Sequence, residues 1–109
     1  MSELPGPVEL LELPDGESRS FRALRYDKGT LRVVPKHQPE GKIVTALRVH
    51  VPLEDKPLFP HYWDLTAATL VAQLEPHLQR PDLARLRFTI TARGIGPRKR
   101  FEVQTVLRG

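Results

Sequence analysis

The sequence predicts an α+β domain: an antiparallel sheet of about five to six strands with one principal helix packed on one face. Several segments alternate apolar and polar residues with the period of two that is typical of strands burying one face. Only residues 66–79 carry an apolar stripe at helical spacing. A single helix of this length buries its stripe best against one face of an antiparallel sheet.

The N-terminal third is expected to hold an arm, an edge strand and a hairpin. Residues 1–7 contain two prolines and a glycine, so we expect a loose arm, followed by an edge strand at 8–13. Residues 20–26 and 30–34 both alternate, and the Asp-Lys-Gly sequence at 27–29 between them is typical of a turn. These two runs therefore predict a β-hairpin.

The clearest strand is expected at residues 42–51, where Arg48 and His50 lie on the polar face. A long loop with three prolines follows at 52–63. In the helix expected at 66–79, Thr66 is a suitable N-cap, and Pro76 predicts a kink or a break because it lacks a backbone donor.

Two further strands are expected at residues 85–92 and 100–107, joined by a hairpin loop that contains Gly94 and Gly96. The residues expected to be buried are Ile43, Leu47, Val49, Leu70, Val71, Leu74, Phe88, Ile90 and Val103.

Length and composition indicate one domain, residues 1–109, with about 39% hydrophobic residues. The sequence has no cysteine, no apolar run long enough for a membrane helix and no signal-peptide pattern, so we expect a cytoplasmic location without membrane contact. Asparagine is absent and Arg outnumbers Lys by 12 to 5. This composition is found in proteins of thermophilic or GC-rich sources.

Charge is unevenly distributed along the chain. Residues 1–18 hold five acidic and no basic residues, whereas residues 19–109 hold all 17 basic residues and the other eight acidic ones. Residues 80–109 alone hold eight basic and two acidic residues. A basic body favours a polyanionic partner, and we expect the acidic segment to lie near the basic face or to compete with its ligand. The alternative is an ordinary solvated surface.

Ten residues are candidates for nucleic-acid binding. Guanidinium groups on an open sheet face and in a glycine-containing loop can hold phosphates, and loop aromatics can stack on bases. The alternatives are a solvated face, a plain hairpin tip and aromatics that close the end of the core. The basic candidates are Arg48, Arg85, Arg87, Arg93, Arg98, Lys99 and Arg100, and the aromatic candidates are Phe59, Tyr62 and Trp63.

Catalysis and metal binding find little support. His50, His61 and three carboxylates lie close together in sequence, but the spacing matches no metal-site pattern, and no serine lies in a nucleophile motif. We therefore expect no enzymatic activity, no metal and no cofactor. The sequence favours a small nucleic-acid-binding domain for single-stranded DNA or RNA. The alternative is a protein-interaction or structural adaptor domain, with another protein or a second copy of the chain as partner.

Overall fold

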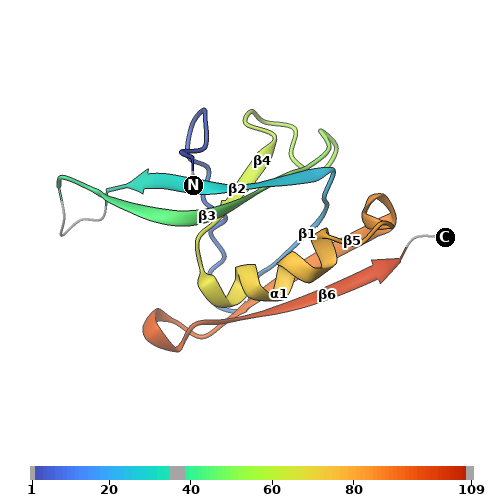
Figure 1. The fold of residues 1–109 in the computed structure, drawn as a ribbon. Helices are drawn as coiled ribbons and strands as arrows, with labels where there is room; N and C mark the ends of the chain where they lie inside the picture. The colour runs from blue at the N-terminus through green and yellow to red at the C-terminus, as the bar shows by residue number, and fades with distance from the viewer. Residues whose placement is uncertain (1, 35–38, 108–109) are drawn as a thin grey trace.

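The computed structural model describes residues 2–34 and 39–107. The strands are β1 (Ser18–Arg22), β2 (Arg25–Val33), β3 (Lys42–His50), β4 (Tyr62–Leu65), β5 (Leu86–Arg93) and β6 (Arg100–Leu107). The helix α1 (Ala68–Leu78) and two short 3₁₀ turns, η1 (Leu83–Arg85) and η2 (Gly96–Arg98), complete the fold (Figure 1). All strand pairs are antiparallel, so the predicted α+β class is confirmed.

The strands form two sheets of three, in the orders β1-β5-β6 and β2-β3-β4, where a single sheet was expected. Only Ala23 and Leu24 separate β1 from β2, so one run of chain serves the first sheet and then crosses into the second. At the crossing, Ala23 is buried and the Leu24 amide donates to the His50 carbonyl at 2.8 Å. Each sheet can therefore bury one face against the other.

The predicted hairpin over residues 20–34 is wrong. The expected turn at 27–29 lies inside β2, and β1 pairs with β5 while β2 pairs with β3. Gly29 serves a close approach of two chain segments and not a turn, since a Cβ there would lie 2.5 Å from the Ser2 carbonyl oxygen.

The N-terminal segment lies against the second sheet. We expected residues 1–7 to be loose, but the Leu4 amide donates to the Thr30 carbonyl at 3.0 Å and Leu4 is buried. The edge strand expected at 8–13 does not form; this stretch makes one parallel bridge, from Leu10 to Asp64. Leu13 then enters the core with 1% exposure.

The remaining elements follow the sequence pattern more closely. β3 and β6 match their predicted ranges to within one residue, and β5 begins one residue later because Arg85 belongs to η1. α1 begins after Ala67 without a side-chain cap, so the expected Thr66 cap is absent. The helix continues through Pro76 to Leu78, because a proline in the last turn removes only one late hydrogen bond. The strand β4 was not expected, and its first two residues lie in the stretch predicted as loop, 52–63.

The core lies between the two sheets and α1, where Phe21 contacts both Trp63 and Phe88. Of the residues predicted to be buried, Val71 and Val103 are half-buried and Ile43 is 62% exposed. Ile43 is the second residue of β3, and at that end the β2–β3 hairpin extends beyond the other strands (Figure 1). The other six are buried: Leu47, Val49, Leu70, Leu74, Phe88 and Ile90.

Candidate nucleic-acid interface

The connection between β5 and β6, which we call the hairpin tip (residues 93–100), gathers four of the predicted basic residues. Gly94 and Gly96 adopt φ angles of +86° and +57°, which let the chain turn tightly. Arg93 and Arg100 are directly opposite each other in the strand register, and Arg98 and Lys99 lie between them in the loop. The predicted glycine-containing connection between the last two strands is therefore present, and it brings these four basic residues to one end of the sheet.

The cations of the hairpin tip are poorly neutralised. Arg93 Nε lies 3.6 Å from Glu102 Oε1, with both side chains more than half exposed. Lys99 Nζ lies 5.5 Å from the centre of the Phe101 ring. Arg98 and Arg100 are exposed, and neither has an ion-pair partner within residues 2–34 and 39–107. The tip therefore presents positive charge to solvent.

The outer face of the β1-β5-β6 sheet continues this surface with hydroxyl groups. Ser18 bonds to Thr91, and Ser20 bonds to Thr89, each through hydroxyl oxygens 2.7 Å apart. At the far end of the same face, Arg87 is half-buried and lies 3.5 Å from Asp55. Guanidinium and hydroxyl donors on one open surface suit phosphate oxygens.

Arg85 is exposed in η1, immediately before β5. It therefore lies at the opposite end of β5 from the hairpin tip and does not extend that cluster.

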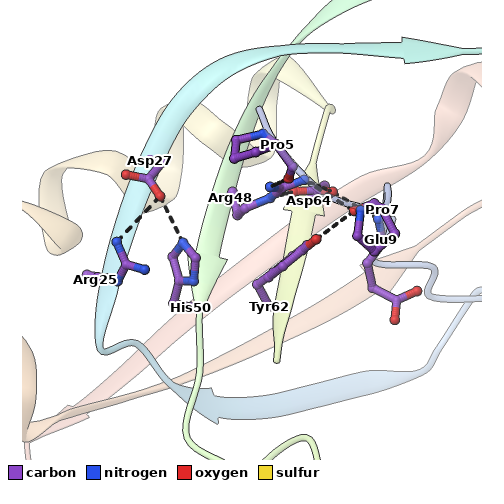
Figure 2. Close-up of polar contacts among 9 residues, drawn as sticks. All are labelled: Pro5, Pro7, Glu9, Arg25, Asp27, Arg48, His50, Tyr62 and Asp64. Atoms are coloured by element: carbon purple, nitrogen blue, oxygen red, sulfur yellow. Dashed lines mark hydrogen bonds and ion pairs between the residues drawn. The ribbon is translucent and has the colours of Figure 1, made fainter. Parts of the chain in front are cut away.

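Arg48 does not belong to this surface. It is only 2% exposed, on the outer face of the other sheet, and its guanidinium is bound on several sides (Figure 2). Nε donates to Asp64 Oδ1 at 2.7 Å and Nη2 donates to Asp64 Oδ2 at 3.1 Å, while the carbonyl oxygens of Pro5 and Pro7 accept further bonds. Burial alone would lower the pKa of Arg48, but the hydrogen bond and charge of Asp64, together with the charges of Tyr62 and Asp27, raise the pKa.

The same network anchors the N-terminal segment over β3 and β4. The Glu9 amide donates to Asp64 Oδ2 at 2.9 Å, and the Tyr62 hydroxyl donates to the Pro7 carbonyl at 2.7 Å. Next to it, the ring nitrogen Nε2 of His50 lies 2.8 Å from Asp27 Oδ2 (Figure 2). Residues 5–9 thus cover this outer face, and no pattern in the sequence predicts that arrangement.

The three predicted aromatic residues do not form one platform. Trp63 is 5% exposed and packs on Phe21, with ring centres 5.4 Å apart. The ring of Tyr62 is covered by the Arg48 guanidinium at 4.0 Å, and burial raises the pKa of its hydroxyl despite the opposing charge of Arg48. Phe59, in the loop between β3 and β4, is 75% exposed. Of the three, only Phe59 therefore exposes most of its ring to solvent.

The acidic N-terminal segment touches the hairpin tip at one point. Asp15 Oδ1 accepts a hydrogen bond from the Gly94 amide at 2.8 Å, and the Gly16 amide donates to the Ala92 carbonyl at 2.8 Å. The expectation that residues 1–18 lie near the basic face is therefore met at residues 15–17, whereas Glu3 and Glu9 lie against the β2-β3-β4 sheet.

Within the described part of the chain, no group of three or more His, Cys, Asp or Glu residues is arranged to hold a metal ion. Over the same residues, no helix has the length and apolar character needed to cross a membrane. Comparison of the chain with protein-family models, curated proteins and solved structures finds no match.

Proposed function

We propose that this protein binds nucleic acid, with a preference for single strands, through the hairpin tip and the adjoining outer face of the β1-β5-β6 sheet. The observation that carries the proposal is the convergence of Arg93, Arg98, Lys99 and Arg100 on one exposed loop, where Glu102 is the one carboxylate among the described residues that forms an ion pair with any of them. Clustered unpaired cations bind the phosphate backbone by releasing its counterions.

The strand order supports this assignment. If β1 and β2 are counted as one bent strand, the chain forms three consecutive antiparallel strands, passes through α1 and places β5 beside β1. This is a Greek-key arrangement. With β6 added, five strands follow the order of the partly open barrel called the OB-fold, a frequent binder of oligonucleotides. In that scheme the hairpin tip is the loop between the fourth and fifth strands, one of the loops that such barrels use for binding.

The outer face of β3 and β4, which OB-fold proteins also use, is covered in this protein by residues 5–9. The proposal therefore assigns the phosphate contacts to the β5–β6 side. Ser18, Ser20, Thr89 and Thr91 supply hydroxyl donors that tolerate any sequence.

A salt titration of binding to single-stranded and duplex DNA and RNA tests the proposal. Affinity should fall steeply with salt, and replacing Arg98 with Ala should weaken binding to all sequences about equally. Arg25→Ala is the matched control, because Arg25 is also exposed but lies on the other sheet. Binding of the parent no tighter than about 100 μM near physiological salt, the weak end of non-specific binding, would overturn the proposal.

One observation favours the alternative of a protein partner. The extended β2–β3 hairpin exposes Ile43 at 62% and Val34 at 65%, and exposed apolar side chains of this kind are common at protein interfaces. If no nucleic acid binds, this hairpin is the surface on which to look for a protein ligand or a second copy of the chain.

A further inference from the structure

Two pairs of arginines are placed directly opposite each other on the outer face of the β1-β5-β6 sheet. Arg22 is opposite Arg87 at one end of β5, and Arg93 is opposite Arg100 at the other. Like charges directly across a strand pair are destabilising, because the side chains project from the same face at short range. An anion bound beside either pair would relieve this repulsion.

The first pair has its anions within the protein. Arg22 Nη2 lies 2.8 Å from Glu54 Oε1, and Arg87 Nη2 lies 3.5 Å from Asp55 Oδ1. The Asp55 side chain is only 8% exposed, and it also accepts the Arg22 amide at 2.9 Å. These carboxylates are held by the loop between β3 and β4, so the first pair is neutralised by the fold itself.

The second pair is not neutralised in the same way. Glu102 Oε1 lies 3.6 Å from Arg93 Nε, and both side chains are exposed by more than half. Arg100 has no carboxylate partner among the described residues. An open hollow of about 420 Å³ is lined by Arg93, Arg100, Phe101 and Glu102. The neighbouring Gly94 amide already binds one oxyanion, the carboxylate of Asp15.

We propose that Arg93 and Arg100 form a site for one phosphate group of a bound nucleic-acid strand, with Glu102 as the residue that the phosphate displaces. This inference rests on the proposed function and specifies its strongest contact. Two guanidinium groups can each donate two parallel hydrogen bonds to a phosphate, which a weak exposed ion pair with Glu102 cannot match. The bound phosphate offsets the repulsion between the two guanidinium groups. Phosphate binding therefore also stabilises the folded hairpin tip.

The test compares Arg100→Ala, Glu102→Gln and the control Arg25→Ala in binding to a single-stranded oligonucleotide at several salt concentrations. Arg100→Ala should weaken binding roughly three- to tenfold at low salt and reduce the salt slope by about one. Glu102→Gln should tighten binding about two- to fivefold, because an opposing charge is removed. Arg25→Ala should change the affinity by less than about twofold. All three positions are exposed, and melting temperatures confirm that the variants are folded.

A second measurement separates this inference from the proposed function. Inorganic phosphate should shift the backbone amide resonances of residues 93–102 in the parent, and the double variant Arg93→Ala, Arg100→Ala should lose these shifts. If the parent binds the oligonucleotide but Arg100→Ala behaves like Arg25→Ala, the phosphate site is wrong while the proposed function stands. If no nucleic acid binds, the proposed function fails, and the absence of phosphate shifts would then overturn the site as well.

Discussion

At the scale of single residues, the Arg48–Asp64 ion pair shows how a charged side chain is accommodated inside the fold. Both side chains are at most 3% exposed, and their charges are compensated by two mutual hydrogen bonds and by backbone groups of residues 5–9. A buried ion pair adds little net stability compared with apolar residues, but removing one partner leaves an uncompensated charge.

We therefore expect Arg48→Ala to lower the free energy of unfolding by about 3–5 kcal/mol, measured by urea denaturation. The double variant Arg48→Met, Asp64→Leu should lose less, because no charge is left unpaired. If Arg48→Ala instead melts like the parent and loses nucleic-acid affinity, the side chain is a ligand contact and not a structural one.

Trp63 and Phe59 give a matched pair of aromatic substitutions. Trp63→Ala should cost about 3–5 kcal/mol of stability, because it empties the space beside Phe21. Phe59→Ala should leave stability within about 0.5 kcal/mol, because the ring is 75% exposed. If Phe59 stacks on a base, its loss weakens binding by about 1–3 kcal/mol. An unchanged affinity for Phe59→Ala would limit the interaction to phosphate contacts.

Tyr62 makes stability depend on alkaline pH. Its pKa in the folded protein is raised above 10.0. At a pH between 10.0 and the folded pKa, the folded state therefore keeps the hydroxyl proton while the unfolded state has lost it. The resulting stability is present below pH 10.0 and is lost as pH rises through the folded pKa. Denaturation curves should therefore show a smaller decline above this pH for Tyr62→Phe than for the parent. Equal declines in both proteins would assign the effect to other groups.

Single residues also show which parts of the candidate site could be predicted from the sequence and which could not. The cations of the hairpin tip could be predicted because four of them lie within eight consecutive positions, 93–100, so any tight turn brings them together. The burial of Arg48 could not, because it depends on Asp64 and on Pro5 and Pro7, which reach it only through the tertiary fold.

At the scale of elements, local periodicity explains which predictions succeeded. β5 buries Leu86, Phe88, Ile90 and Ala92 in strict alternation, and α1 buries Leu70, Leu74 and Leu78 at helical spacing. β4 was not predicted because its last three residues are all buried, although they point to opposite faces of the sheet. Such a strand shows no alternation between buried and exposed residues. The turn predicted at Asp27–Gly29 was wrong. Glycine is required at position 29 because the Ser2 carbonyl, from a segment distant in sequence, approaches it closely.

Two parts of the chain before β1 have different structural roles. Residues 2–8 lie on the second sheet, whereas Leu13 is 1% exposed in the main core. Leu13→Ala should therefore cost about 2–5 kcal/mol, measured by thermal or urea denaturation. Val8→Ala is the control and should cost far less, because Val8 is 41% exposed. Similar losses for both variants would mean that the whole segment acts as one unit.

At the scale of the whole molecule, one bent chain run ties two sheets together, and charge is divided between the two. On the β2-β3-β4 sheet, Arg48 and His50 are bound by Asp64 and Asp27, whereas Arg98 and Arg100 of the hairpin tip have no carboxylate partner among the described residues. The sequence showed the charge imbalance but not this division, because strand partners determine which charges are neutralised.

The pairing of β1 with β5 joins residues far apart in the chain: Ser18 is opposite Thr91, and 73 positions separate them. The β1-β5-β6 sheet therefore cannot form until residues 86–107 have been synthesised, whereas β2 and β3 can pair earlier. Domains dominated by such distant contacts fold in roughly milliseconds to seconds, because a large loop must close before the contacts form. Stopped-flow measurements should show refolding in this range of milliseconds to seconds, and refolding within microseconds would contradict the prediction.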